Sequence, residues 1–216
     1  MASDTRDRLI RTTSRLLRQQ GYAATGLNQV MAEADAPKGS MYFHFPGGKE
    51  ELAAAAIDRF NERVSARLAA ILDESSSVRD AVTQILDDYI RLLDRTEFTQ
   101  GCAVATVAVE SAPDRTVLAE STDRALRGWT DLVADALEAE GRPADEAHRL
   151  GTLVIALIEG TVVMGKGERS TEPLFAVRDA IRDLLATPFP AAAGREWAEP
   201  AAPSPARDAT ATATPA

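Results

Sequence analysis

The sequence predicts an all-α protein of about nine helices, with a small amino-terminal three-helix domain followed by a larger helical domain. Apolar residues recur at helical spacing along most of the first 186 positions. Between the periodic stretches lie glycine, proline, serine or aspartate, which end or cap helices. We expect the two domains to span residues 1–48 and 49–186.

Composition is typical of a globular protein. The chain has 216 residues, of which 45% are hydrophobic and 26% charged, enough for one sizeable core or for a small domain and a larger one. No apolar run reaches the length of a membrane span, and the first residues lack a signal-peptide apolar region. We therefore expect a cytoplasmic protein without membrane contact. The single cysteine, Cys102, excludes an intramolecular disulfide and a cysteine-based metal site.

The net charge of −9 is unevenly distributed. Residues 1–49 hold seven Lys/Arg and four Asp/Glu and carry +3, whereas the rest of the chain, with 17 basic and 29 acidic side chains, carries −12. A basic first segment on an acidic body suits an anionic partner at that end, although ordinary solvated charge explains +3 equally well. Residues 187–216 hold six of the eleven prolines among many alanines. We expect them to form a disordered tail.

The first helix is predicted over residues 4–20, and Gly21 follows at a position where glycine commonly ends a helix. Two short helices joined by a tight turn are then predicted over residues 25–45. Thr25 can cap the first of them, because its hydroxyl can accept the amide of Asn28. Pro37 suits the first position of the second.

The second short helix, over residues 37–45, has Met41 and Phe45 on one face. Its other faces carry a cation, a hydroxyl, a phenol and an imidazole, from Lys38, Ser40, Tyr42 and His44. Lysine neutralises phosphate, and hydroxyl and ring groups reach phosphate oxygens or base edges. The pattern is therefore typical of a DNA-reading helix-turn-helix.

Five longer helices are predicted beyond this motif from periodic apolar residues and the breaks between them. They span residues 49–72, 78–95, 113–140, 145–164 and 172–186, with a break at residues 165–167. Residues 101–110 are nearly all small or β-branched, so periodicity alone allows either a buried strand or a buried helix.

Several short motifs carry a family resemblance. They are Gly21-Tyr22, Thr25, Ala32-Glu33-Ala34, Lys38-Gly39-Ser40-Met41-Tyr42-Phe43-His44-Phe45 and Lys49-Glu50-Glu51-Leu52. Together they resemble the amino-terminal domain of TetR-family transcriptional repressors. The link after the second short helix is one residue longer than usual in that family. Its Gly47-Gly48 pair, with Gly101-Cys102 and Ile158-Glu159-Gly160, is similar to the LmrA/YxaF-like branch.

The resemblance favours a helix for residues 101–110 and implies a dimeric repressor on a palindromic double-stranded DNA operator, released by a small-molecule effector. Contact with phosphate is implied for Thr25, Tyr42 and Lys49. Contact with base edges or the phosphates beside them is implied for Lys38, Gly39, Ser40 and His44. Each has an ordinary alternative, such as packing for Tyr42 or a solvated position for His44. The longer link changes the position of Lys49 most, so the implied contact of Lys49 depends most on it.

The resemblance also places the homodimer contact on the last two long helices, near Leu157, Gly160, Thr161, Met164, Leu174, Val177 and Ile181. The effector cavity would lie among the other helices, lined by Tyr89, Phe98, Cys102, Val107, Trp129, Ile155 and Glu159. Ordinary core packing explains these residues equally well, except that an acid such as Glu159 inside an apolar helix needs a partner. We expect a mainly apolar effector with one polar or cationic group.

Two other function classes stay open: a helical protein–protein interaction module without DNA binding, and a small-molecule enzyme on a helical bundle. A protein-binding helix would more often present an apolar stripe. For an enzyme, His44 and His148 are far apart and lack metal-ligand spacing, and Lys38-Gly39-Ser40 lacks the earlier glycine of a phosphate-binding loop. We expect no catalytic residue, no metal and no cofactor.

Overall fold

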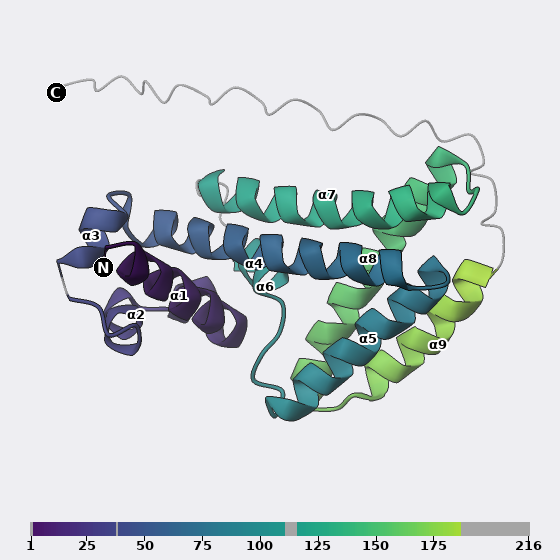
Figure 1. Cartoon of the computed structure of the whole chain (residues 1–216). Coiled ribbons are helices and arrows are strands. Elements are labelled where there is room, and N and C mark those ends of the chain that lie inside the picture. The colour runs from purple at the N-terminus through teal and green to yellow at the C-terminus, as the bar shows by residue number, and fades with distance from the viewer. Residues whose placement is uncertain (1, 38, 111–115, 187–216) are drawn as a thin grey trace, which may run out of the picture.

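The structure, a computed structural model, describes residues 2–37, 39–110 and 116–186. Within these ranges the chain forms nine α-helices and no strand, which confirms the all-α class (Figure 1). The helices are α1 (Ala2–Ala24), α2 (Leu27–Glu33), α3 (Ser40–His44), α4 (Gly48–Glu74), α5 (Val78–Arg95), α6 (Ala103–Glu110), α7 (Thr116–Ala139), α8 (Ala144–Glu168) and α9 (Glu172–Ala186).

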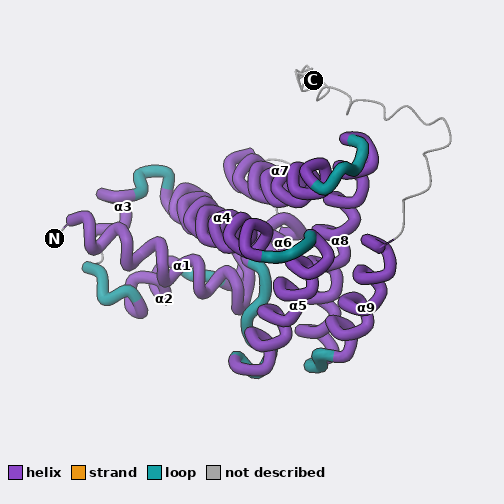
Figure 2. The backbone as a smooth tube through the Cα atoms, turned by 45° about the vertical axis from the view of Figure 1, so that its right-hand side comes forward, coloured by secondary structure: helices purple, strands orange, loops and turns teal. Residues whose placement is uncertain are grey.

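Helices α1 to α3 form a compact group at one end of the molecule, which we call the head (Figure 1). Helix α4 leaves the head and runs through the remaining helices, the body, packing against α1 near its start and along α7. Helices α5, α8 and α9 pack together at the far side, and the short α6 lies between α1 and α7 (Figure 2). Helix α4 is therefore the covalent link between head and body, and α1 also packs directly on α6 of the body.

A continuous apolar core joins the head to the body. One cluster of buried side chains includes Met41 and Phe45 of the head, Leu52 and Ile57 of α4, and Trp129 of α7. Burial of each large apolar side chain contributes about 1.5–3 kcal/mol. Because close-packed interiors transmit displacements, a shift of α4 in the body alters the packing of the head.

The helix-turn-helix is present, with a second helix shorter than predicted. Gly21, with a φ of 78°, interrupts α1 at the predicted position. Helix α3 begins at Ser40, whose N–H donates to the Pro37 carbonyl at 2.9 Å in a turn before the helix. Pro37 therefore belongs to the connecting turn, and the prediction that it opens the helix is wrong.

The predicted break at residues 165–167 is also wrong, because α8 continues to Glu168. A Cβ added to Gly165 would lie 2.6 Å from Leu174 Cδ1 and 2.9 Å from the Ser170 carbonyl oxygen. This glycine lets α8 pack closely against α9 and does not end the helix.

Helix α8 is long and apolar enough by length and composition to cross a membrane, contrary to the expectation from the sequence. Nearly half of its most apolar stretch is buried inside the protein, and it packs against α7 and α9. Its apolar character therefore suits the central helix of a bundle. The predicted helix start at residue 113 and the predicted tail over residues 187–216 lie outside the described residues.

Candidate nucleic-acid interface and effector cavity

Arg8 of α1 fixes the turn between α2 and α3. Its Nε donates to the Ala34 carbonyl at 3.0 Å, and its Nη2 donates to the Asp35 carbonyl at 3.1 Å. Asp35 has a φ of 48°, in a left-handed conformation that aspartate tolerates better than most residues. The geometry of the helix-turn-helix is thus held from outside by α1.

Helix α3 presents its polar and aromatic side chains outward. Met41 and Phe45 are fully buried, whereas Tyr42 and Phe43 are 63% and 76% exposed. The rings of Phe43 and His44 meet edge to face, with centroids 5.0 Å apart. Sequence reasoning passed over Phe43, although the two inward positions of this short helix leave it beside Tyr42 on the free side.

At the start of α3, Ser40 is half-buried and its Oγ donates to the Pro37 carbonyl at 2.7 Å. The lone pairs of this hydroxyl stay available to a further donor. Gly39 is exposed, and a Cβ added there would meet nothing within 4 Å, so packing does not explain the glycine. Lys38, the predicted cation of this surface, lies outside the described residues.

Thr25 does not cap α2 as predicted. The residue is only 2% exposed, and its Oγ1 donates to the Gly21 carbonyl at 2.6 Å. The N-cap position is Gly26, which has no side-chain cap. The predicted bond to the amide of Asn28 is wrong because the hydroxyl turns back to the carbonyl at the kink in α1.

The longer link between α3 and α4 is accommodated by its two glycines. Gly48 has a φ of 72°, a conformation that side chains with a Cβ rarely adopt. The Gly47 N–H donates to the carboxylate of Glu51 at 2.7 Å. This contact closes the link onto the first turn of α4 and fixes the position of Lys49 in that turn.

Lys49 is half-buried and faces the end of α1. Its Nζ donates to the Ala23 carbonyl at 3.3 Å and lies 4.3 Å from the centroid of the Tyr22 ring. Together with Tyr42 and the first residues of α2 it borders a surface hollow. The structure therefore brings Lys49 and Tyr42 to one surface.

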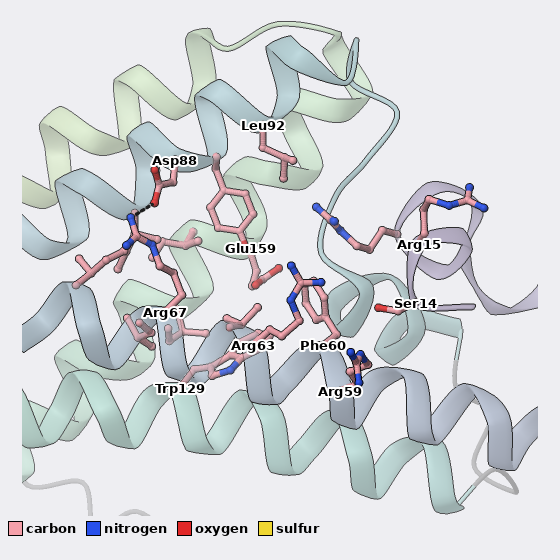
Figure 3. Close-up of a pocket in the computed structure, with 18 of the residues that line it drawn as sticks. Ser14, Arg15, Arg59, Phe60, Arg63, Arg67, Asp88, Leu92, Trp129 and Glu159 are labelled. Atoms are coloured by element: carbon pink, nitrogen blue, oxygen red, sulfur yellow. Dashed lines mark hydrogen bonds and ion pairs between the residues drawn. The ribbon is translucent and has the colours of Figure 1, made fainter. Parts of the chain in front are cut away.

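A cavity of about 420 Å³ lies between α1, α4, α5 and α8, with one wall completed by α7 (Figure 3). Four side chains expected to line an effector cavity do line this one: Tyr89, Trp129, Ile155 and Glu159. The other three do not. Phe98 lies outside it beneath the guanidinium of Arg169, 5.9 Å away, whereas Cys102 and Val107 are buried in the core.

Glu159 is one of two acidic groups of the cavity wall, with Asp88. Burial raises its pKa to about 7, and a hydrogen bond from the Cys102 thiol acts in the opposite direction. Its Oε2 is buried and has no hydrogen-bond partner among the described residues. Burial and the nearby Glu159 charge raise the pKa values of both the Tyr89 phenol and the Cys102 thiol well above their ordinary values. Both groups are therefore neutral at physiological pH.

The sequence analysis missed the arginines of the cavity wall. Seven line it: Arg11, Arg15, Arg18, Arg59, Arg63, Arg67 and Arg95. Their spacing was an available signal, because residues three or four positions apart share a helix face. Sequence alone did not tell that the arginine faces of α1 and α4 meet across one cavity.

Two side chains of the body hold the end of α1 next to this cavity. Lys166 of α8 donates through Nζ to the carbonyls of Arg18 and Gln19, at 3.1 Å each. The Glu110 carboxylate of α6 accepts from the N–H groups of Tyr22 and Ala23, at 2.5 and 3.0 Å. The cavity and the head are thus connected through polar contacts as well as through α4.

The free surface of α8 and α9 differs in part from the predicted homodimer contact. Three of the expected residues are buried within the single chain: Thr161, Leu174 and Ile181. Exposed large apolar side chains on these helices are Val163, Met164 and Phe175. In the ranges that the structure describes, no group of three or more His, Cys, Asp or Glu side chains could hold a metal ion.

Two family profiles match the chain in succession. The profile described as "Bacterial regulatory proteins, tetR family" matches residues 9–56, which hold the helix-turn-helix. The profile described as "Transcriptional regulator LmrA/YxaF-like, C-terminal domain" matches residues 79–180, which hold much of the body. Together they cover most of the helices described above.

Full-length relatives agree with the profiles. The chain is 31% identical over 182 residues to the HTH-type transcriptional regulator LmrA of Bacillus subtilis, covering 84% of this chain and 97% of the relative. It is 35% identical over 182 residues to the HTH-type transcriptional regulator YxaF of the same organism, covering 84% and 95%. The fold also matches a cysteine mutant of CifR, a TetR-family regulator complexed with a 26-base-pair double-strand operator DNA. That match has a TM-score of 0.71 and 20% identity, covering 82% and 94% of the two chains.

Proposed function

This chain belongs to the TetR family of transcriptional regulators, and from that premise we propose that it is a homodimeric repressor released from a palindromic operator by a small-molecule effector. In this proposal it acts in the cytoplasm and catalyses no reaction. The observation that carries the proposal is the short α3, which exposes Tyr42 and Phe43 while Met41 and Phe45 anchor it. A rigidly held helix with free polar and ring groups suits the major groove.

Within that groove we assign base or phosphate contact to Ser40, Tyr42 and His44, with Lys38 and Gly39 at the start of α3. Lys49 would contact phosphate beside Tyr42, because both border the same surface hollow. The buried side chain of Thr25 would act indirectly, by holding the chain at the start of α2.

For dimerisation we propose the exposed apolar face of α8 and α9, around Val163, Met164 and Phe175. A two-fold axis there would present two heads to half-sites about one helical turn of DNA apart, roughly 34 Å. Effector binding would release DNA only if the effector prefers a body conformation that spaces the heads wrongly. Helix α4 suits this role because it borders both the cavity and the head.

The direct test is a gel-shift titration of the full-length protein against the promoter region upstream of its own gene. Ser40→Ala and Tyr42→Phe should each weaken binding about three- to tenfold, because each removes a hydroxyl contact. Arg127→Gln, which removes an exposed arginine of α7 far along the chain from the head, is the matched control. Binding no tighter than to scrambled DNA, with both head variants silent, would contradict DNA recognition and favour a protein-binding module.

A further inference from the structure

The walls of the cavity carry an excess of positive charge. Seven arginines line it, three from α1, three from α4 and one from α5, against two acids, Asp88 and Glu159. In Figure 3 the side chains of Arg63 and Arg67 extend from α4 toward the space between α4 and α5. An apolar effector with a cationic group, as the sequence suggested, would meet this charge unfavourably.

Carboxylates balance only three of these arginines. The ion pairs are Arg11 with Asp7 at 3.8 Å, Arg15 with Glu33, and Arg67 with Asp88 at 3.0 Å. The others, Arg18, Arg59, Arg63 and Arg95, have no ion-pair partner in the described part of the chain. Four arginines without an ion-pair partner on one cavity favour the binding of an anion there.

Two of these four arginines are partly withdrawn from water. Arg59 is half-buried, and its Nε is buried without a hydrogen-bond partner among the described residues. Arg18 is also half-buried, and burial lowers its pKa, with the neighbouring charge of Arg63 acting in the same direction. Desolvated positive charges that repel each other gain most from a bound anion.

Glu159 does not cancel this charge. Its carboxyl is held among apolar residues with Oε2 unpaired, and burial raises its pKa to about 7. It is therefore protonated in a large share of molecules at neutral pH. A protonated carboxyl can donate a hydrogen bond to an anion.

An aromatic surface lies beside the arginines. The rings of Phe60 and Trp129 pack edge to face, with centroids 6.4 Å apart and planes at 71°. The indole Nε1 of Trp129 donates to Ser65 Oγ at 3.1 Å, which fixes the orientation of the ring. The Arg18 guanidinium carbon lies 5.6 Å from the Phe60 centroid, so charge and ring face the same space.

We propose that the effector of this cavity is an aromatic organic anion. Its charged group, a carboxylate, sulfonate or phosphate ester, is held by Arg18, Arg59 and Arg63, and its ring body lies against Phe60 and Trp129. The regulatory role of this anion rests on the proposed function, whereas its binding to the cavity does not. The volume of about 420 Å³ falls within the range of small-molecule sites.

The test uses two fluorescent probes with the same aromatic body. The first is 8-anilinonaphthalene-1-sulfonate, and the second is N-phenyl-1-naphthylamine, which lacks the sulfonate. In titrations of the full-length protein the sulfonate should bind at least about tenfold more tightly, because charge-assisted hydrogen bonds add to the same ring burial. Arg59→Gln and Arg63→Gln should each reduce that preference about three- to tenfold, and the double variant should abolish it.

Matched variants separate a charge effect from a loss of structure. Arg63→Lys keeps the charge and should retain part of the preference, while Arg127→Gln, outside the cavity lining, should leave it unchanged. Circular dichroism checks that each variant is folded. The proposal is overturned if the neutral probe binds equally well, or if the preference survives in the folded double variant. It is also overturned if phenyltrimethylammonium, a cationic aromatic, binds more tightly than the sulfonate and loses that binding in Glu159→Gln.

Measuring both sulfonate binding and operator binding in the same variants separates the anion site from the proposed function. Tight, arginine-dependent binding of the sulfonate supports the anion site whatever happens to DNA. If that binding leaves operator affinity unchanged, the release step of the proposed function is contradicted and the anion site stands. If the sulfonate does not bind while the operator is still recognised, the anion site is contradicted and DNA recognition stands.

Discussion

Arg18 and Gly101 hydrogen-bond each other in both directions. The Gly101 N–H donates to the Arg18 carbonyl at 3.1 Å, and the Arg18 Nε donates to the Gly101 carbonyl at 3.0 Å. Lys166 donates to the same Arg18 carbonyl, and the Arg18 guanidinium lines the cavity. One residue of α1 therefore contacts the cavity, the α5–α6 connection and α8. An anion that draws this guanidinium inward would strain the contacts that hold α1 to the body.

Lys166→Met tests this connection. The substitution leaves the Arg18 and Gln19 carbonyls without their charged donor, so we expect the free energy of unfolding to fall by about 1–3 kcal/mol. We also expect the arenesulfonate probe to change operator affinity by a smaller factor than in the unsubstituted protein. Chemical denaturation measures the first effect, and gel shifts with and without the probe measure the second. Lys166→Arg keeps a cationic donor and serves as the control; an unchanged factor in Lys166→Met would place the coupling elsewhere.

Glu110→Ala tests the contact between α6 and the kink in α1. Its carboxylate accepts the N–H groups of Tyr22 and Ala23, and removing it should lower the free energy of unfolding by about 1–3 kcal/mol. Glu110→Gln retains one acceptor oxygen and should lose less. Gly21→Ala should be destabilising too, because Gly21 has a φ of 78° and its added Cβ would overlap Oε1 of this carboxylate. Thermal and denaturant unfolding of the three variants ranks their losses of stability. An unchanged free energy of unfolding in Glu110→Ala would contradict a stabilising role for the Glu110 carboxylate.

Features that depend on residues close together in the sequence could be predicted, whereas features that depend on tertiary packing could not. Helices α5 and α9 match their predicted ranges, because apolar periodicity and a polar break at each end are local signals. Gly165 was misread, since a glycine that ends a helix and one that admits a neighbouring helix look alike until Leu174 is seen beside it. Only the tertiary structure shows that Gly165 belongs to the second kind.

The candidate sites divide in the same way. The outward face of α3 follows from the spacing of Met41 and Phe45 along one short helix. The cavity depends on helices far apart in sequence, so Tyr89, Trp129, Ile155 and Glu159 were expected there only as the resemblance implies, and the arginines opposite them were missed. The sign of the cavity charge could be seen only once α1, α4 and α5 were placed together.

Glu159 predicts a pH dependence of stability. Its pKa is raised from 4.5 to about 7 in the folded protein, so folding favours the protonated carboxyl. The resulting penalty is absent below about pH 4.5, grows between pH 4.5 and 7, and levels off above pH 7 at roughly 3 kcal/mol. Glu159→Gln cannot titrate, so its stability relative to the unsubstituted protein should rise over that interval. Denaturant unfolding at pH 4.5, 6 and 8 measures the difference, and a constant difference would mean that Glu159 titrates normally.

Gly165 and Gly167 provide a matched pair on α8. An added Cβ at Gly165 would meet Leu174 Cδ1 at 2.6 Å, the Ser170 carbonyl oxygen at 2.9 Å and Leu93 Cδ1 at 3.1 Å. Two of these atoms end flexible side chains, but the carbonyl belongs to the backbone of the α8–α9 connection, so α8 would have to shift against that connection. We expect Gly165→Ala to lower the free energy of unfolding by about 1–3 kcal/mol, the usual cost of overpacking.

Gly167 lies two residues further along the same helix, in open space with nothing within 4 Å of its added Cβ. Gly167→Ala should therefore raise the free energy of unfolding by about 0.5–1 kcal/mol, because alanine loses less backbone entropy in a helix. The two substitutions share their chemistry and their helix, so opposite signs in denaturant unfolding would come from the close contacts of Gly165 with Leu93, Ser170 and Leu174. Val163 and Met164 directly precede Gly165 on α8 and are exposed, so a shift of α8 at Gly165 would move them. We therefore expect Gly165→Ala to weaken self-association in light scattering and Gly167→Ala to leave it unchanged. Stabilisation by both substitutions would show that α8 does end near residue 165, as the sequence pattern first suggested.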